Sequence, residues 1–526
     1  MRSTQYSISR TLVIRHMVWA MLFAGGAAMG FSPSSGPSEA SSRGGQGLGS
    51  VLRVTGSVGA VHLPSSRPVV VNDDSSRVDP DHWAEHRPYA MIELPRLDDA
   101  EFFIPRAIND HGTMAATLLR PGHGGYDIFL IDEYGGMEQV PLSPQHPDAY
   151  PVGLNNSGVM PAFGLSMPIN SGYWDAGHNF HVLAGLGGDN GGITDINESG
   201  VLVGSSNLAG PVDVSAAFIY QDGVMTHLPD LDPEGDVMTG AQGVNNAGVA
   251  VGYSLDPEVS FQWAAPVRWI DGEIERLPID DPTGGSGYAY DINNEGIAVG
   301  FFSRKRDPDL GGRVACYWKP DGSVHLLPSR FERQRTRARM INDRGNIIGD
   351  TVHNDIKWTV SVVWDSPEST GIALRDLVPP EAEVGYIVAW DLNNRGQMVG
   401  FIDRFGNYDQ GMFMTPVSYS FDLSSAVPGR AGEPNTVEVT NAPPNARVNL
   451  VAGTIGGGQM ISGCSFNTNA LQISNPRLVR SVITDADGNA TITGTLDPNY
   501  DGRNILFQAY IADTCEISNL IVQAFE

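Results

Sequence analysis

Two histidine pairs are the first residues in this sequence whose types and spacing could hold a metal. His82-Trp83-Ala84-Glu85-His86 matches the H-x-x-E-H zinc motif of inverted metalloproteases, in which a helix presents both imidazoles on one face. Pro80 and Pro88 bracket the motif within nine residues, which leaves too little room for such a helix. His178 and His181 lie in a strand-and-turn context, where one of them is expected to face solvent. We interpret the motif as an exposed segment, with zinc chemistry as the alternative, and assign no metal ligand.

Two acidic stretches resemble parts of calcium-binding loops. Residues 230–236 carry three aspartates and a glutamate, but Ala241 stands at the twelfth position, where such a loop needs a bidentate glutamate. Asp485, Asp487 and Asn489 have a similar spacing, and a hairpin turn is the preferred explanation for them. The sequence therefore predicts no cofactor, with calcium at either stretch as the alternative.

Motifs for other enzyme classes are absent from the sequence. It contains no phosphate-binding P-loop, no G-x-S-x-G nucleophile elbow and no paired-cysteine metal motif. A carboxylate pair for glycoside hydrolysis is set by the fold, so it could be hidden among the 60 acidic residues. We assign no catalytic residue and prefer a non-enzymatic binding or structural protein. A secreted polysaccharide-acting enzyme is the alternative.

The dominant pattern in the chain is Asn-x-x-Gly after an aliphatic residue, which occurs seven times. Successive asparagines are about 42 to 51 residues apart, the range of β-propeller blades. The seven pairs are Asn109 and Gly112, Asn155 and Gly158, Asn197 and Gly200, Asn245 and Gly248, Asn293 and Gly296, Asn342 and Gly345, and Asn393 and Gly396. In the last five copies a second glycine follows four residues later, at Gly204, Gly252, Gly300, Gly349 and Gly400. The first two copies have Ala116 and Ala162 there and are degenerate.

Asn-x-x-Gly between two apolar runs predicts a tight hairpin. Asparagine can bind its own backbone two residues on, and glycine adopts positive φ without steric cost. The second glycine would permit a bulge or a close approach of backbones. We therefore interpret the seven asparagines as structural turns, with a ring of ligands around a channel as the alternative. On this interpretation Asn293→Ala weakens a hairpin and abolishes no activity.

Each hairpin is followed by two more predicted strands. The third strand is aromatic, as at 267–269 and 315–318, and the fourth ends in Leu-Pro, as at 277–278. Seven antiparallel four-stranded units that bury their faces against one another predict a seven-bladed β-propeller over residues 86–417. Residues 91–95 resemble the fourth strand of a unit, but no first three strands precede them. The unit of Asn393, in turn, lacks a fourth strand. Pairing the two would close the ring; a linear solenoid is the alternative. An enzymatic site would lie at the mouth of the channel.

The phrase Ile-Asn-x-x-Gly-x-x-Val-Gly, followed by an Ala-Phe-x-Trp-like strand, resembles the HAF repeats of predicted bacterial extracellular proteins. The resemblance covers roughly residues 89–416, with five good and two degenerate copies. It implies secretion and repetition and implies no established activity, so it assigns no catalytic residue.

The C-terminal segment, residues 418–526, has a different pattern. Alternating strands such as 436–439 and 505–509 are separated by turn clusters, which predicts a small β-sandwich with an accessory or adhesive role. Cys464 and Cys515 both lie here and are predicted to form a disulfide. Closing a loop of this length could stabilise the fold by about 4 kcal/mol in the chain-entropy model. Cys316 lies in an apolar strand and is interpreted as a small buried hydrophobe.

Composition and the N-terminus bound the compartment and the partners. The net charge of -27 repels nucleic acid and anionic membranes. Residues 1–30 combine Arg2, Arg10 and Arg15 with a short apolar run and small residues, which predicts a cleaved signal peptide. Residues 31–85 form a low-complexity or extended segment. We expect a secreted, extracellular or periplasmic protein without a stable membrane span, whose partner is an extracellular protein or a glycan.

Overall fold

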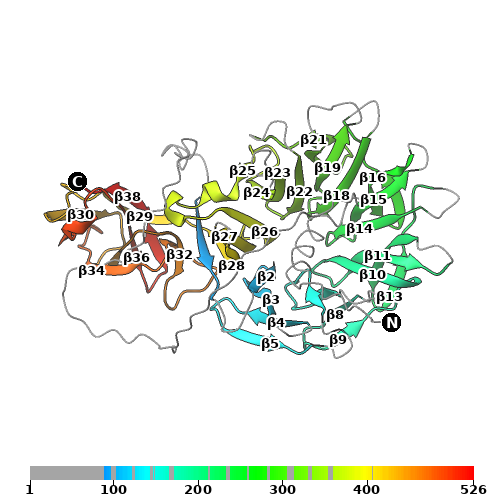
Figure 1. Cartoon of the computed structure of the whole chain (residues 1–526), viewed down its shortest axis with the longest axis horizontal. Helices are drawn as coiled ribbons and strands as arrows, with labels where there is room; N and C mark the ends of the chain where they lie inside the picture. Colours follow the sequence, from blue (N-terminus) through cyan, green and yellow to red (C-terminus); the bar gives the residue numbers. More distant parts are fainter. Residues whose placement is uncertain are drawn as a thin grey trace, which may run out of the picture. The chain divides into compact units, whose positions relative to one another are not determined.

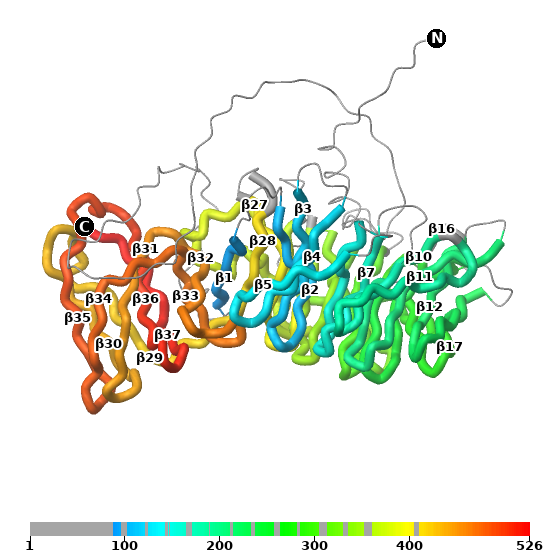
Figure 2. Tube along the Cα trace, turned by 90° about the horizontal axis from the view of Figure 1, so that it is seen from below, coloured from blue at the N-terminus to red at the C-terminus, as the bar shows by residue number. Residues whose placement is uncertain are grey.

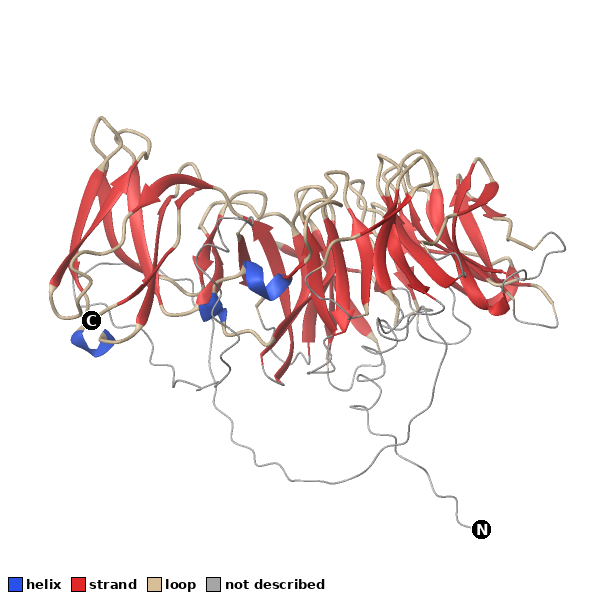
Figure 3. Cartoon of the chain, turned by 90° about the horizontal axis from the view of Figure 1, so that it is seen from above, coloured by secondary structure: helices blue, strands red, loops and turns tan. Residues whose placement is uncertain are grey.

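The computed structural model describes residues 88–526 apart from short connections. The segments outside the description are 1–87, 96–101, 121–124, 143–145, 147, 165–170, 211–213, 233–236, 257–259, 281–284, 305–312, 330–334, 353–358 and 405–406. The regular secondary structure of the described residues is almost entirely β-strand (Figure 3). They contain three short 3-10 helices, η1 (Leu374–Leu377), η2 (Pro380–Ala382) and η3 (Pro498–Tyr500), and no α-helix.

Small antiparallel sheets are arranged as in a propeller (Figure 1). Five of them are separate and four-stranded, with their strands in chain order. They are β6 (Tyr150–Pro151), β7 (Met160–Phe163), β8 (Gly172–Trp174) and β9 (Phe180–Val182); β10 (Gly187–Ile196), β11 (Leu202–Leu208), β12 (Ser215–Gln221) and β13 (Val224–His227); β14 (Thr239–Val244), β15 (Ala250–Asp256), β16 (Ser260–Ile270) and β17 (Glu273–Arg276); β18 (Gly285–Ile292), β19 (Ala298–Arg304), β20 (Val314–Trp318) and β21 (Val324–Leu326); and β22 (Thr336–Ile341), β23 (Ile347–Val352), β24 (Thr359–Trp364) and β25 (Ile372–Ala373).

The remaining strands of the repeat region form one eight-stranded sheet, so five separate blades are present and not the seven predicted. Its order is β26 (Tyr386–Leu392), β27 (Met398–Arg404), β28 (Asn407–Pro416), β2 (Phe102–Ile108), β3 (Met114–Leu119), β4 (Tyr126–Ile131) and β5 (Met137–Val140), with β1 (Tyr89–Glu93) also on β28. One parallel bridge, between Phe103 and Gln410, joins the two halves. Such a contact between neighbouring units cannot be predicted from a repeat pattern, which describes each unit alone.

The N-terminal strand β1 pairs with the last strand of the repeat region, as the surplus strand at residues 91–95 predicted. The pairing is antiparallel and runs from Tyr89 opposite Pro416 to Glu93 opposite Met412. Figure 2 shows β1 beside β28, although the two are at opposite ends of the repeat region in sequence. Met91 is fully buried in the core that β1 shares with β26 to β28. The ends of the repeat region are therefore joined by main-chain hydrogen bonds.

A β-bulge explains the second glycine of the repeat. In six of the units the innermost strand shifts register just before the asparagine, for example between Ala289 and Asp291 in β18. The bulge brings the carbonyl of Tyr288 so close to Gly300 on β19 that a Cβ there would overlap the carbonyl oxygen. Gly204, Gly252, Gly349 and Gly400 face the same obstruction. Glycine is required at these places because backbone, and not a movable side chain, occupies the space.

Buried tryptophans link neighbouring sheets. The indole N–H of Trp269, on β16, donates to the carbonyl of Pro229 at 2.8 Å, in the Leu-Pro segment that ends the preceding unit. Trp174, Trp318 and Trp364 make the same bond to Pro141, Pro278 and Pro328. All four indoles are at most 1% exposed. These rings therefore fill the core between units and offer no surface to a sugar.

The C-terminal strands form a second eight-stranded sheet around its own core. Its order is β34 (Arg477–Ile483), β31 (Arg447–Gly453), β36 (Asn504–Ile511), β37 (Glu516–Ser518), β29 (Tyr419–Leu423), β30 (Pro434–Thr440) and β35 (Ala490–Thr495), with β38 (Ile521–Ala524) on β36. Apolar residues of β30 and β35 pack against those of β31 and β36. A separate hairpin, β32 (Gly456–Met460) with β33 (Ala470–Ile473), packs with β1.

The predicted disulfide between Cys464 and Cys515 is confirmed. It anchors the loop that follows β32, and this loop packs on the joined ends of the repeat region. The backbone N–H of Phe466 donates to the carbonyl of Glu133, and the side chain of Gln397 donates to the carbonyl of Phe466. The Phe466 ring lies 4.8 Å from that of Phe413 on β28. Among the described residues, no helix is long and apolar enough to span a bilayer.

Candidate functional site

The seven repeat asparagines form a closed ring of hydrogen bonds around the axis of the propeller. Each side-chain Nδ2 donates to the main-chain carbonyl of the next asparagine along the chain, at 2.9 to 3.3 Å. Asn393 completes the ring by donating to the carbonyl of Asn109 at 2.9 Å. The Oδ1 atom accepts backbone N–H groups of its own turn; that of Asn245, for example, accepts those of Ala247 and Val249. Each asparagine therefore forms a turn and also ties it to the neighbouring turn.

The residue after each asparagine forms a second closed ring. Its backbone N–H donates to the side-chain oxygen of the corresponding residue in the next unit, at 2.7 to 3.0 Å. The members are Asp110, Asn156, Glu198, Asn246, Asn294, Asp343 and Asn394. Burial raises the pKa of Glu198, and the carboxylates of Asp110 and Asp343 raise it further. These polar groups satisfy one another, so this end of the axis is a hydrogen-bonded belt.

We expect Asn293→Ala to destabilise the fold by about 2 kcal/mol, because it removes the acceptor for Ile297 N–H and the donor to Asn342. Asn293→Asp separates the two roles. Aspartate serves a turn well, but here it loses the donor and places a charge against a carbonyl oxygen. In denaturant unfolding at pH 7 it should be no more stable than the alanine variant. Wild-type stability of the aspartate variant would show that the turn alone matters.

Three carboxylates, Asp195, Asp291 and Asp391, lie deeper along the axis, two residues before their asparagines. Each accepts the N–H of the following residue and one N–H of a neighbouring unit; Asp291, for example, accepts those of Ile292 and Ile341. Burial, with a smaller contribution from the Asp391 carboxylate, raises the pKa of Asp195 to about 7, although the N–H groups of Val244 and Ile196 oppose the shift. Burial also raises the pKa of Asp391, to about 6, and raises that of Asp291, where Asp195 contributes. The three aspartates belong to sheets that are not consecutive, and each carboxylate links its own sheet to a neighbouring one through the two N–H groups that it accepts.

The raised pKa values predict that the fold gains stability on mild acidification. A carboxyl with a higher pKa in the folded state than in the unfolded chain binds its proton more tightly when folded. Its stabilising contribution is complete below pH 4 and is lost as the pH rises through about 6 to 7. We expect the free energy of unfolding to fall by at least about 1 kcal/mol from pH 5 to pH 8. Asp195→Asn should flatten this slope; an equal slope in the variant would contradict the assignment.

The position three residues before the asparagine, which is the bulged position in six of the units, varies from unit to unit. Whereas asparagine is invariant in the seven copies, this position carries Arg106, Val152, Thr194, Gln242, Tyr290, Arg339 and Trp390. All seven are half-buried. The construction of the ring therefore constrains the asparagine and leaves the bulged residue free to differ.

Arg106 is stacked between two aromatic rings from neighbouring units. Its guanidinium carbon lies 4.4 Å from the centroid of Trp390 and 4.8 Å from that of Tyr150, and its Nε donates to Thr117. Burial lowers the pKa of Arg106, although the nearby tyrosines oppose this effect. Burial raises the pKa of Tyr150 to about 12. A rigid cation between aromatic faces is a common recognition element at binding surfaces.

A second aromatic group lies between the sheets of β14 to β17 and β18 to β21. Tyr253 and Tyr288 are 4.6 Å apart between ring centroids, and Tyr288 stacks on Phe301 at 5.5 Å. Tyr290 is 5.8 Å from Phe301. The three tyrosines are half-buried, so parts of their rings reach solvent.

The histidine pairs and acidic stretches that were considered as metal sites either make other contacts or lie outside the described residues. His181 contacts Asp175 at 2.8 Å and His178 lies near Glu138, both in or beside the exposed β8–β9 turn. Asp485 accepts the N–H groups of residues 487 and 489, as a hairpin turn requires. Residues 82–86 and 233–236 lie outside the described residues. Within the described part of the chain, no group of three or more His, Cys, Asp or Glu side chains is placed to hold a metal.

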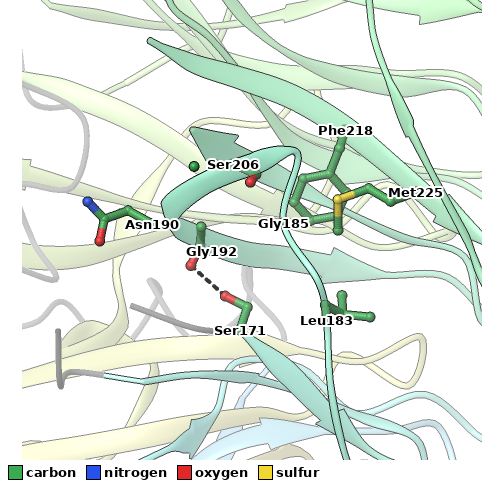
Figure 4. A pocket seen from close by; sticks show the side chains of 10 residues that line it. Ser171, Leu183, Gly185, Asn190, Gly192, Ser206, Phe218 and Met225 are labelled. Carbon is green, nitrogen blue, oxygen red and sulfur yellow. Dashed lines mark hydrogen bonds between the residues drawn. The ribbon is translucent and has the colours of Figure 1, made fainter. Parts of the chain in front are cut away.

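A small pocket between the sheets of β6 to β9 and β10 to β13 offers little room (Figure 4). Its volume of about 20 Å³ is enough for one water molecule. Ser171, Leu183, Asn190, Ser206, Phe218 and Met225 line it together with glycines. The Ser171 hydroxyl donates to the carbonyl of Gly191 at 2.7 Å across this seam. We interpret the pocket as a packing defect between two sheets.

Sequence reasoning missed the aromatic and arginine residues of the innermost strands. These residues occupy one position of the repeat. A comparison that looks for residues shared by all copies does not detect a position at which the copies differ. The signal that could have found them is the alternation of Arg335, Arg337 and Arg339 in a chain with net charge -27.

Comparisons with known proteins find similarity of fold alone. No protein-family model matches the chain, and no curated protein matches it. Virginiamycin B lyase from Staphylococcus aureus is 11% identical over 63% of this chain and 100% of its own, with a TM-score of 0.36. The β-propeller domain of the Trilobed protease from Pyrococcus furiosus is 12% identical over 52% of this chain and 83% of its own, with a TM-score of 0.37. Prolyl oligopeptidase B from Galerina marginata is 8% identical over 79% of this chain and 56% of its own, with a TM-score of 0.39. We transfer none of their activities to this chain.

Proposed function

We propose that this chain is a secreted, non-enzymatic protein whose propeller is a platform for binding an extracellular protein or glycan. The observation that carries the proposal is the contrast within the repeat. Asparagine is constant and builds the ring, whereas the position three residues before it varies. In four of the seven units this position carries arginine, tyrosine or tryptophan, the residue types that dominate binding surfaces.

We further propose that the platform has seven blades and that its units are HAF repeats. The asparagine ring has seven members, and the eight-stranded sheet contains two units, one of β26 to β28 with β1 and one of β2 to β5. The bridge of Phe103 to Gln410 is the contact that merges them. The C-terminal domain would be the accessory sandwich of such a protein.

Secretion is supported by the character of residues 1–30 and by the disulfide of Cys464 and Cys515, since structural disulfides persist in oxidising compartments. The axial aspartates support a non-enzymatic function. Each holds two backbone N–H groups that link neighbouring sheets, which is a structural role.

The proposal is tested by screening residues 31–526 on a glycan array and against extracellular protein extracts, with assays for hydrolysis of each ligand found. We expect binding without hydrolysis, and loss of binding in Trp390→Ala. Tyr134→Ala is the matched control, because Tyr134 is 69% exposed at the tip of an outer hairpin. Hydrolysis of a bound polysaccharide would replace the proposal with the enzymatic alternative. Equal loss of binding in both variants would exclude the inner-strand surface.

A further inference from the structure

A loop of the C-terminal domain, residues 461–469, spans the seam at which the ring of the repeat region closes. On one side of this seam is the last unit, β26 to β28 with β1, and on the other side is the first unit, β2 to β5. The Phe466 ring belongs to an apolar core that contains Phe103 of the first unit and Phe413 of the last. The loop therefore packs against both units at once.

Hydrogen bonds tie the same loop to both units. The Phe466 carbonyl accepts the side-chain N–H of Gln397, in the last unit, at 2.6 Å. The Asn467 side chain donates to the His111 carbonyl of the first unit at 2.7 Å and to the Glu133 carboxylate at 2.8 Å. A segment that belongs to neither unit thus holds the two units together.

Gln397 also connects this loop to the asparagine ring. Its side-chain oxygen accepts the Nδ2 group of Asn393 at 2.8 Å, and the same Nδ2 group donates to the Asn109 carbonyl in the bond that completes the ring. A chain of hydrogen bonds therefore runs from the loop through Gln397 and Asn393 to the first unit. Gln397 is 2% exposed, so displacing the loop would deprive a buried amide of its closest acceptor.

The Cys464–Cys515 disulfide holds the loop at the position that reaches the seam. Cys464 is two residues before Phe466 and packs in the apolar core that contains Ala90 of β1. Cys515 lies between β36 and β37, directly after the exposed residues 512–514. Cys464 is only 7% exposed, whereas Cys515 is half-buried. Of the two residues, Cys515 is therefore the more accessible to a thiolate in solution.

We propose that this disulfide is a modification site for a dithiol reductant and that its reduction opens the seam of the ring. A thiolate of the reductant attacks the Cys515 sulfur, and the Cys464 thiolate leaves. The second thiol then attacks the mixed disulfide and releases Cys515. Both cysteines become thiols by taking up two electrons and two protons, which the dithiol loses as it forms its own disulfide.

Reduction removes a covalent link between positions 51 residues apart in sequence. The loop then regains conformational entropy, which favours its departure from the seam. Since the seam lies between the first and last units, its opening changes the ring as a whole. The inference goes beyond the proposed binding function and does not depend on which ligand the platform binds.

Thermodynamic linkage makes the proposed effect reciprocal. If the disulfide favours the closed seam, the closed seam must favour the disulfide by the same factor. A substitution in the repeat region that weakens the contacts across the seam should therefore make the disulfide easier to reduce. A disulfide that stabilises the C-terminal domain alone would not respond to such a substitution.

Hydrogen–deuterium exchange of residues 31–526, with and without dithiothreitol as the dithiol, measures the opening. In the reduced protein we expect the amides of β1 and those of β28 opposite it to exchange about tenfold faster or more. The amides of the separate sheet of β14 to β17 should change less than about twofold. Cys464→Ala with Cys515→Ala should exchange like the reduced protein and should not respond to dithiothreitol. Alkylation and mass spectrometry distinguish the two new thiols from Cys316, which is free and buried.

A glutathione titration of Gln397→Ala tests the reciprocal effect. We expect its disulfide to be reduced about fivefold more readily than that of the wild type. Asn346→Ala is the matched control, because Asn346 occupies the corresponding place in the preceding unit. It accepts the Nδ2 group of Asn342 in the same way but donates to the Asp365 carbonyl. Its disulfide should shift by less than about twofold.

Three results would overturn the inference. The first is equal exchange of the β1 amides in the oxidised and the reduced protein. The second is faster exchange spread evenly over all sheets, which would mean that the disulfide stabilises the whole fold without controlling the seam. The third is an equal shift of the glutathione titration in Gln397→Ala and Asn346→Ala. If the double alanine variant fails to fold, the reduced wild-type protein and the Gln397 variant still decide between these results.

Discussion

Gly300→Ala is expected to destabilise the protein by about 3 kcal/mol or more, a large effect for adding one methyl group. The added Cβ would overlap the carbonyl oxygen of Tyr288, which the bulge of β18 holds against β19. Relief requires β18 and β19 to separate, which would strain the hydrogen bonds between them. Denaturant unfolding followed by tryptophan fluorescence measures the loss.

Gly272→Ala is the control for this substitution. Gly272 has a φ of +84° with no atom within 4 Å of a Cβ, so only conformational strain of about 1 kcal/mol is expected. Ala116 faces the bulge of β2 at the place corresponding to Gly300, so that unit has a backbone spacing that accepts a methyl group. Equal losses at Gly300 and Gly272 would mean that the bulge does not impose the glycine.

Removing β1 is expected to have the largest effect. A chain that begins at residue 96 leaves one edge of β28 without a partner along five residues, while β27 stays on the other edge, and it uncovers the buried Met412 and Met414. An uncovered apolar edge strand pairs with other chains, so we expect oligomers or aggregates and loss of a cooperative transition. Size-exclusion chromatography with light scattering and thermal unfolding would detect both effects.

A chain that begins at residue 88 retains β1 and is the matched control, which should remain cooperative. Adding a synthetic peptide of residues 88–95 to the shorter chain should restore part of its stability. If the two chains melt within about 2 °C of each other, ring closure does not depend on β1.

The sequence could predict two kinds of feature. These are turns, which depend on a few neighbouring residues, and pairings, which follow from counting the strands or cysteines that lack a partner. Asn-x-x-Gly determines a turn within five residues. The extra strand at residues 91–95 could be matched to the strand that is missing from the unit of Asn393. The Cys464–Cys515 pairing followed from composition. The bond from each Asn Nδ2 to the next unit could not be predicted, because it depends on the spacing between sheets.

Neither could the pattern reveal the position of the three axial aspartates or the merging of two units through Phe103 and Gln410. Each depends on side chains or backbones from units distant in sequence that meet only in the ring. The candidate site was missed for a related reason. Its arginines and aromatic residues are defined by departures from the repeat, which have no meaning until the repeat is placed in space.

The pairing of β1 with β28 also sets a time for folding during synthesis. The ribosome makes Tyr89 more than 300 residues before its partner Pro416. At about 5 to 20 residues per second, at least about 15 s separate the two. The delay between the synthesis of Asn109 and that of Asn393, whose side chain donates to the Asn109 carbonyl, is almost as long. The first units can fold as they emerge, but β1 has no partner until the last unit is made, so the ring closes only after the whole repeat region has been translated.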